Sequence, residues 1–336
     1  MSVIDETSKG LAAFLSQQWQ KNVAIENVTQ ASAGARRRNL LFDAVAGGER
    51  TKLVATIVPF AAMQLNPIEV EASNLQLAEA AGMPVPHVHA VTSDTSWVGG
   101  PFFITTQIAG ETIPRQVLRL VEKTPGLGAK MARQCGAALA RLHSADAAKA
   151  HPLVPRPSGH PLETALAVSR RSIDELLQPS PAFTLCFNWL KRNIPPAPKR
   201  ITVVHGDFRN GNIIVGTDGL RASLDWEGCH LGDPMEDCGW VVQRMWRFRN
   251  DTLEVGGFGS VDDLRAGYQE AGGEWDEARF RWWKAQGTLR WGLGLAGQAK
   301  QHLDGSVPSI VLAASGRRVA ELEYDTLMLL KRGFGA

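Results

Sequence analysis

VVHGDFRNGNIIVGTDGLRASLDWEGCHLGDPMEDCGW, residues 203–240, is the stretch that decides the fold. Within it, short apolar runs alternate with polar clusters rich in Gly, Asp and Asn. Runs of this length between Gly and Asp residues predict short strands joined by turns. Asp207, Asn212 and Asp225 then stand at strand ends or in loops, where polar side chains can converge on one site.

These three side chains are suited to one kind of chemistry. Asp207, Asn212 and Asp225 offer hard oxygen atoms, and no pair of thiolates or imidazoles accompanies them. Mg²⁺ prefers such oxygens and is usually held by one or two carboxylates together with substrate phosphates. Phosphoryl transfer needs an oriented acceptor hydroxyl, a group that takes its proton, and metal ions that neutralise the phosphates. The spacing of the three residues predicts this reaction.

The order of these residues also carries a family resemblance. His205-x-Asp207-x-x-x-x-Asn212, followed by Asp225, resembles the catalytic loop and the metal-binding aspartate of the protein-kinase-like aminoglycoside and choline phosphotransferases. HGDFRNGN, LDWE and GDP are most similar to the branch that is found alone in many bacteria and fused to acyl-CoA dehydrogenases in some eukaryotes. The alternative is that the Asp and Asn side chains only cap turns. That alternative explains each residue separately but not the ordered set.

The resemblance implies an α+β protein with a protein-kinase-like bilobal fold. Residues 1–110 would form a small lobe with an antiparallel sheet and one helix, and residues 111–336 a larger, mainly helical lobe, with a hinge at 107–111. The apolar pattern agrees, because alternation between residues 27 and 60 predicts three antiparallel strands. Periodic apolar residues predict a further helix over Asp5–Gln20.

The resemblance also implies where ATP, or GTP, would bind. Its phosphates would lie under a loop at residues 32–38, where small residues let backbone amides approach. The run Arg36–Arg38 has two interpretations, a cluster that binds phosphates or an anionic acceptor, and a solvated edge. The adenine edge would meet the hinge backbone. The implied nucleotide-binding residues are Ser32, Gly34, Arg36, Glu71, Gln107, Ile108 and Ala109.

One position departs from the resembled pattern. In kinase-like folds the third strand carries a Lys that meets the phosphates and pairs with a Glu of the next helix. Here the register places Thr56 at that position and Glu71 at the matching position of the helix. Three explanations stay open: an arginine of 36–38 substitutes, the phosphates are met differently, or the site is weakened.

The loop after residue 204 holds the predicted catalytic residues. Asp207 would take the proton of the acceptor hydroxyl. His205 is either a general base or, as the resemblance favours, a brace that holds the loop. Arg209 either faces the acceptor or pairs with a carboxylate. The resemblance assigns Mg²⁺ to Asn212 and Asp225.

The composition excludes several classes of protein. The chain has 336 residues with 36 basic and 34 acidic side chains, and the net charge of +2 gives no electrostatic case for a nucleic-acid partner. Four cysteines without CxxC spacing argue against a zinc site or a disulfide framework and fit a reducing cytoplasm. The first residues lack the plan of a signal peptide, and no apolar run approaches the length of a membrane span. We therefore expect a cytoplasmic protein without a membrane partner.

From these observations we expect an ATP- and Mg²⁺-dependent phosphotransferase that acts on a hydroxyl of a small molecule. The candidate acceptor region carries no obvious acidic run, and Arg244, Arg247 and Arg249 follow the GDP motif. These charges favour an uncharged or anionic acceptor, such as a hydroxy acid or a hydroxyacyl thioester, over a polycationic aminoglycoside. An antibiotic O-phosphotransferase is the alternative within this class.

A second alternative belongs to another class. Thr56 favours a non-catalytic nucleotide-binding protein that has kept the fold, whereas the complete set of Asp207, Asn212 and Asp225 argues against it. A protein kinase would need an activation segment between Asp225 and the GDP motif, and the sequence has no room for one.

Overall fold

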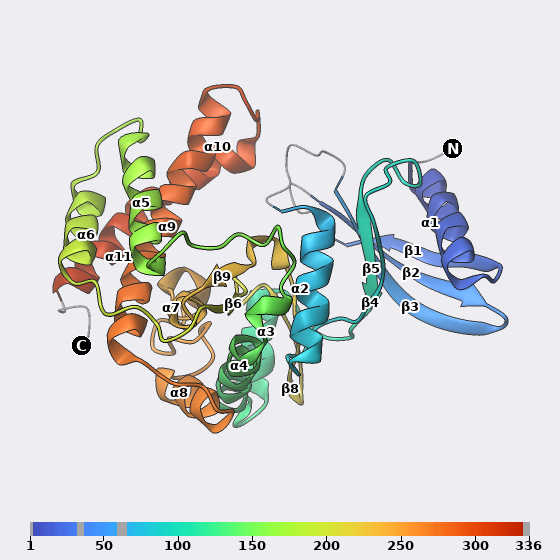
Figure 1. Cartoon of the computed structure of the whole chain (residues 1–336), viewed down its shortest axis with the longest axis horizontal. Helices are drawn as coiled ribbons and strands as arrows, with labels where there is room; N and C mark the ends of the chain where they lie inside the picture. The colour runs from blue at the N-terminus through green and yellow to red at the C-terminus, as the bar shows by residue number, and fades with distance from the viewer. Residues whose placement is uncertain (1–2, 32–36, 59–65, 332–336) are drawn as a thin grey trace.

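The computed structural model describes residues 3–31, 37–58 and 66–331, which form two lobes (Figure 1). An antiparallel sheet dominates the N-terminal lobe, on the right in Figure 1, and helices dominate the C-terminal lobe on the left. The predicted α+β arrangement is confirmed. The lobe boundary at residue 110 stays a prediction.

The N-terminal sheet has five strands in the order β1-β2-β3-β5-β4, and every neighbouring pair is antiparallel. On β3, Leu53, Ala55 and Ile57 are fully buried while the residues between them are not, because successive side chains of a strand point to opposite faces. The strands are β1 (Val23–Gln30), β2 (Arg38–Ala46), β3 (Glu49–Ile57), β4 (Val88–Thr92) and β5 (Phe102–Thr106).

Two helices cover this sheet. Leu11 and Phe14 of α1 (Val3–Trp19) join the core formed by the buried residues of β3. α2 (Ile68–Ala80) contacts β4 and β5, and it shares the large core of the C-terminal lobe with Phe103. The sheet therefore has one face toward α1 and one face toward α2 and the other lobe.

The C-terminal lobe is built around α4, which packs closely against α8. A Cβ atom at Gly136 of α4 would lie 2.0 Å from the carbonyl oxygen of Leu264 in α8, so only glycine permits this approach. The helices of this lobe are α3 (Pro114–Lys123), α4 (Leu127–Ser144), α5 (Pro161–Asp174), α6 (Pro181–Arg192), α7 (Met235–Val241), α8 (Val261–Glu270), α9 (Glu277–Leu303), α10 (Ile310–Gly316) and α11 (Val319–Lys331).

The stretch that decides the fold forms two small antiparallel pairs. β6 (Thr202–Val204) pairs with β9 (His230–Gly232), and β7 (Ile213–Gly216) pairs with β8 (Gly219–Ser223). The first pair brings the loop that follows β6 close to the segment that precedes β9. Residues that are separate in the sequence therefore lie next to one another at the site.

Apolar residues at helical spacing predict one helix over 237–248 and another over 310–330, and in the structure both are interrupted. The helix expected over 237–248 ends at Val241, because Gln243 adopts an extended backbone and its side chain donates to the carbonyl oxygens of Gly239 and Lys284. The helix expected over 310–330 is split at Gly316, a poor helix former that also packs against Ala299.

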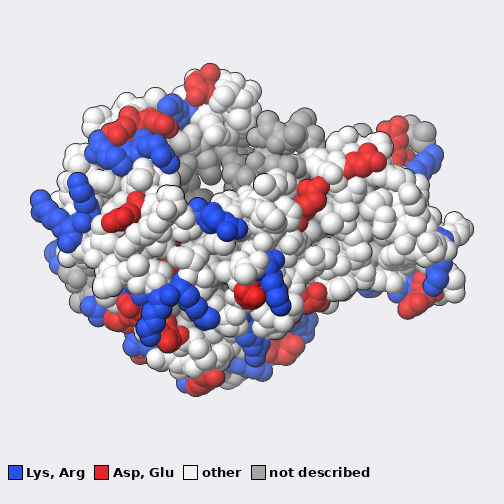
Figure 2. All heavy atoms as spheres, in the orientation of Figure 1, with Lys and Arg blue, Asp and Glu red and all other residues white. Residues whose placement is uncertain are grey.

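Acidic and basic side chains are intermixed on the face shown in Figure 2, in keeping with the small net charge. None of the helices in the described ranges is both long enough and apolar enough to cross a membrane.

Candidate active site

The loop between β6 and β7, residues 205–212, is held against the residues that precede β9. The Leu224 amide donates to the Asn212 carbonyl oxygen at 2.8 Å, and the ring of His205 bonds to the carbonyl oxygen of Leu224 at 3.1 Å. Gly206 has φ +80°, and a Cβ atom there would lie 2.3 Å from the carbonyl oxygen of Gly228. The tight contact between the two segments therefore requires glycine at residue 206.

Asp207 is the centre of this loop, and three donors fix its carboxylate. Asn212 Nδ2 donates to Oδ2 at 2.7 Å, Trp240 Nε1 donates to Oδ1 at 2.7 Å, and Arg209 Nε lies 3.0 Å from Oδ1. Hydrogen bonds to a charged acceptor are the strong ones. The Asp207 carboxylate is thus held in one orientation while 27% of its side-chain surface stays exposed.

Arginine and tryptophan side chains alternate around Asp207. The guanidinium of Arg209 lies 4.5 Å from the ring centroid of Trp246, and that of Arg290 lies 3.9 Å from the ring of Trp240. Arg290 also donates to the carbonyl oxygen of Gly206 at 2.8 Å. Such stacking on aromatic faces orients a guanidinium and leaves some N–H donors available.

His205 is a brace in this structure. Its Nδ1 accepts from the Asp207 amide and its Nε2 bonds to the Leu224 carbonyl oxygen, so both ring nitrogens are used inside the loop. Burial lowers the pKa of His205, which favours the neutral ring that these two bonds require. The general-base interpretation of His205 therefore has no geometric support here.

A buried carboxylate anchors the start of the same loop. Asp237 accepts from the backbone amides of His205 and Gly206 at 2.8 and 2.9 Å, and from His143 Nε2 at 3.2 Å. Burial opposes the charged form, but the His143 hydrogen bond and the nearby imidazoles bring the pKa of Asp237 below its ordinary value. An Asp at the start of a helix commonly caps it, whereas Asp237 lies inside α7 and holds the loop.

Asn212 and Asp225 supply the oxygens that a magnesium ion needs. Asn212 donates through Nδ2, and neither its Oδ1 nor the Asp225 carboxylate has a hydrogen-bond partner among the described residues. Asp225 adopts a left-handed backbone, with φ 64°. Surrounding protein and the charge of Glu227 raise its pKa, a shift that a bound cation would reverse.

These two residues fit Mg²⁺ as a partial site. Within the described ranges no group of three or more His, Cys, Asp or Glu side chains forms a complete cage. Mg²⁺ commonly takes one or two protein ligands and fills its remaining positions with phosphate oxygens and water. Asn212 and Asp225 therefore match the pattern of a metal that arrives with a nucleotide.

Glu71 is the helix glutamate whose expected lysine partner on the third strand is absent, and in the structure it pairs with Arg37. Arg37 Nη1 lies 2.7 Å from Glu71 Oε1, and Nη2 lies 3.0 Å from Glu227 Oε2. Glu71 belongs to α2, and Glu227 follows Asp225 by two residues. Burial raises the pKa of Glu71, and the charge of Arg37 opposes that rise. Thr56 stands on β3 opposite Asn39.

The other predicted nucleotide-binding residues fall into two groups. Ser32, Gly34 and Arg36 lie outside the described residues. In the hinge, the Gln107 amide donates to the Lys52 carbonyl oxygen, and the Ala109 carbonyl oxygen accepts from Arg221 at 2.7 Å. The amides of Ile108 and Ala109 have no backbone partner within the described ranges. The Gly110 amide likewise has no backbone partner there, so these three amides are the hinge donors that could meet an adenine edge.

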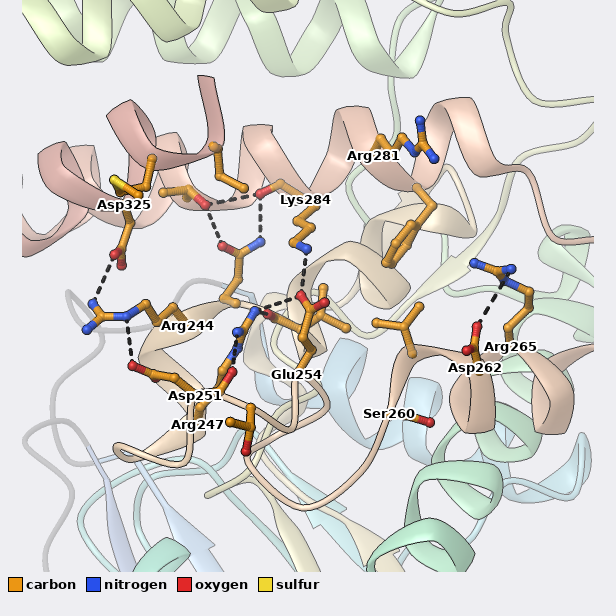
Figure 3. A pocket seen from close by; sticks show the side chains of 18 of the residues that line it. Arg244, Arg247, Asp251, Glu254, Ser260, Asp262, Arg265, Arg281, Lys284 and Asp325 are labelled. Atoms are coloured by element: carbon orange, nitrogen blue, oxygen red, sulfur yellow. Dashed lines mark hydrogen bonds and ion pairs between the residues drawn. The ribbon is translucent and has the colours of Figure 1, made fainter. Parts of the chain in front are cut away.

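A pocket of about 880 Å³ opens elsewhere in the C-terminal lobe, beside α8, α9 and α11 (Figure 3). Its described lining includes no residue of 205–227, so it lies apart from Asp207. Arg244 and Arg247, which favoured an anionic acceptor on sequence grounds, belong to its wall. Arg244 is paired with Asp251 and Asp325. Arg247 is paired with Glu254, which also binds Lys284.

The structure adds site residues that the sequence did not single out. Neither Trp240 nor Arg290 is among the predicted site residues, yet both contact the loop that holds Asp207. A partial sign was present, since Trp240 sits three residues after Asp237 in the GDP-containing stretch. Arg290 is remote in sequence and offered no sign.

Comparisons with known proteins agree with this geometry. A model of the phosphotransferase enzyme family matches residues 27–283. Acyl-CoA dehydrogenase family member 10 of Mus musculus is 27% identical over 314 residues, which cover 85% of this chain and 27% of the relative. Acyl-CoA dehydrogenase family member 11 of Gallus gallus is 30% identical over 190 residues, which cover 55% of this chain and 24% of the relative. The chain spans about a quarter of the length of these curated relatives.

Solved structures show the same fold. A crystal structure from Ralstonia eutropha JMP134, provisionally assigned as an aminoglycoside phosphotransferase, gives a TM-score of 0.68 at 21% identity and covers 94% of this chain and 97% of that chain. The GDP complex of aminoglycoside 2'-phosphotransferase-IIIa gives 0.65 at 12% identity, with 95% and 99% covered. A ternary complex of aminoglycoside phosphotransferase APH(4)-Ia with AMP-PNP and hygromycin B gives 0.62 at 16% identity, with 94% and 98% covered. The predicted kinase-like bilobal fold is confirmed.

Proposed function

Because this chain belongs to the phosphotransferase enzyme family, we propose that it transfers the γ-phosphoryl group of ATP to a hydroxyl of a small anionic or uncharged molecule. A hydroxy acid or a hydroxyacyl thioester is the acceptor class that we favour. The observation that carries the proposal is the carboxylate of Asp207, which three donors hold beside the free oxygens of Asn212 and Asp225. Since one solved relative holds GDP, GTP is tested together with ATP.

Asp207 is the proton acceptor in this proposal. As the acceptor oxygen forms its bond to the γ-phosphorus, the bond from that phosphorus to the β–γ bridging oxygen breaks, and the hydroxyl proton passes to Asp207. Proton acceptance of this kind contributes typically about 10²–10⁴ in rate. Trp240 and Asn212 fix the direction of the carboxylate, so the acceptor hydroxyl can be aligned before the reaction begins.

The metal-binding oxygens belong to Asn212 and Asp225. When bound there, Mg²⁺ would neutralise the charge of the phosphate groups during transfer. Burial and the charge of Glu227 raise the pKa of Asp225, and a cation bound to this carboxylate would favour its charged form. Affinity for Mg²⁺ with nucleotide should therefore fall sharply when Asp225 is neutralised.

The charges around Asp207 support the acceptor class. Arg209 contacts the carboxylate directly and Arg290 stacks on its partner Trp240, with 21% and 36% of their side-chain surfaces exposed. Each guanidinium is ion-paired, Arg209 with Asp207 and Arg290 with Glu236, and what each offers to a carboxylate or phosphate of the acceptor is its remaining N–H donors. Arg244 and Arg247 line a pocket that includes no residue of the Asp207 loop, so they give the acceptor class no such support.

Thermal unfolding with nucleotides tests the proposal. ATP and GTP are each added with and without Mg²⁺ to the wild type and to the Asp225→Ala variant. We expect a Mg²⁺-dependent rise in Tm for the wild type that the variant loses, because ligands that bind only the folded state stabilise it. No rise with either nucleotide would contradict the proposed function.

A further inference from the structure

In this protein the cation that pairs with Glu71 comes from the residue just before the second strand and not from the third strand. Kinase-like folds place a lysine on the third strand, where it contacts the nucleotide phosphates and the helix glutamate. Here β3 carries Thr56, and Arg37 occupies Glu71. We propose that Arg37 is the residue that binds the phosphates of the nucleotide, in place of the third-strand lysine. The inference rests on the proposed function, since it assumes a nucleotide at this site.

The strand register explains how the substitution works. β2 pairs with β3 so that Arg38 lies opposite Ile57 and Asn39 lies opposite Thr56. Arg37 directly precedes β2 and shares the sheet face of Asn39 and Thr56, because side chains alternate along a strand. Diagonal neighbours on one face of a sheet are about 7–8 Å apart. An arginine side chain spans that distance, so Arg37 and a lysine at residue 56 would place their charged groups in the same region.

The contacts of Arg37 join the elements that surround a nucleotide. Its guanidinium binds Glu71 of α2 at 2.7 Å and Glu227 at 3.0 Å, two residues beyond Asp225. Only 13% of the Arg37 side chain and 2% of the Glu71 side chain are exposed. Glu71 is therefore a fixed anchor, and it holds the guanidinium toward the segment that carries the metal-binding aspartate.

Arg37 has donors to spare for a phosphate. A guanidinium carries five N–H groups, and the described contacts use one nitrogen for Glu71 and another for Glu227. Glu227 is the more exposed of the two carboxylates, with 21% of its side chain open against 2% for Glu71. Phosphate oxygens can therefore replace Glu227 while Glu71 keeps the guanidinium in place.

The neighbouring arginine supplies a matched control. Arg38 points to the opposite face of the sheet, where its Nη2 donates to the carbonyl oxygen of Val98 at 3.2 Å. Val98 belongs to the core beneath α1. Arg38 and Arg37 are adjacent in sequence and equal in charge, yet only Arg37 reaches the carboxylates near Asp225.

The test is direct nucleotide binding, measured by isothermal titration of ATP with Mg²⁺ below the unfolding temperature. The proteins are the wild type, Arg37→Ala, Arg38→Ala, and the double variant Arg37→Ala with Thr56→Lys. Arg37→Ala should raise Kd by about 10- to 100-fold, the change expected for one lost charge-assisted hydrogen bond. Arg38→Ala should leave Kd within about twofold of the wild type. The double variant should bind with a Kd at least about tenfold lower than that of Arg37→Ala.

Each result separates a phosphate contact from a merely structural role. An unfolding scan without nucleotide reports the stability of each variant independently of binding. Arg37→Ala with wild-type Kd would overturn the inference and leave the proposed function standing. A double variant that binds no better than Arg37→Ala would also overturn it, since the two positions would then not serve one role. A wild type that binds neither ATP nor GTP would overturn both proposals.

Discussion

A chain of charged side chains that ends on the 205–212 loop should make the stability of the fold depend on pH. His230 Nε2 lies 3.1 Å from Glu236, whose other oxygen accepts from Arg290 at 2.8 Å, and Arg290 in turn donates to Gly206. Burial disfavours a charged imidazole, but the Glu236 carboxylate and the Gly228 carbonyl raise the pKa of His230 to about 9. The protonated ring is therefore part of the folded structure at neutral pH.

The size of the effect follows from the difference between the folded and the unfolded chain. An unfolded histidine has a pKa of about 6.5, and each pKa unit corresponds to about 1.4 kcal/mol. His230 at about 9 therefore contributes about 3 kcal/mol of stability. Because the folded pKa is the higher one, the contribution is complete below about pH 6.5 and is lost as pH rises through 9.

Urea unfolding from about pH 6 to about pH 10 measures this contribution. The free energy of unfolding of the wild type should fall by about 3 kcal/mol over that range, and His230→Gln should lose most of the fall. His87→Gln is the control, since His87 is an exposed histidine with its own partner, Glu79, and it should keep the wild-type slope. A wild-type free energy that stays constant from pH 6 to 10, or an equal slope in His230→Gln, would refute the reasoning.

Two further predictions concern the loop itself. Trp240→Phe removes the donor to Asp207 and should lower kcat roughly tenfold with an unchanged nucleotide Kd. Trp275→Phe loses an indole bond to Glu277 and none to the loop, so it should leave kcat unchanged; equal kcat values for both variants would contradict the role. Gly206→Ala combines a positive φ with a clash, whereas Gly272→Ala has a positive φ and nothing within 4 Å. The first should therefore lower Tm clearly more than the second, which costs only about 1–2 kcal/mol of backbone strain, and equal losses would exclude the close contact.

Most of the fold could be predicted from the sequence, because motifs and apolar patterns depend on residues that are close together in the chain. The ordered motif that contains Asp207, Asn212 and Asp225 identified the family, and alternation of apolar residues predicted the first three strands of the five-stranded N-terminal sheet. The helix break at Gln243 was missed, because its cause is a hydrogen bond to the Lys284 carbonyl, 41 residues away. Periodicity within a window does not register such a contact.

The contacts that organise the candidate site are mostly long-range. Arg290 reaches Gly206 across 84 residues, and Arg37 reaches Glu71 across 34. The sequence showed a glutamate without its lysine and three arginines nearby, and the β2–β3 register separates Arg37 from Arg38 by placing them on opposite faces of the sheet. Asp237 illustrates the same limit, since its residue type suggests a helix cap and only the fold reveals that it holds backbone amides of the loop.

Product analysis tests the central claim most directly. The wild type and the Asp207→Asn variant are incubated with Mg²⁺, ATP or GTP, and, in separate reactions, hydroxy acids, hydroxyacyl thioesters and aminoglycosides, and phosphate esters are identified by mass spectrometry and ³¹P NMR. We expect a new phosphomonoester on an anionic hydroxylated acceptor, formed at least about 10²-fold more slowly by Asp207→Asn, with nucleotide binding retained. Phosphorylation confined to aminoglycosides, or an Asp207→Asn variant that turns over at the wild-type rate, would contradict the claim.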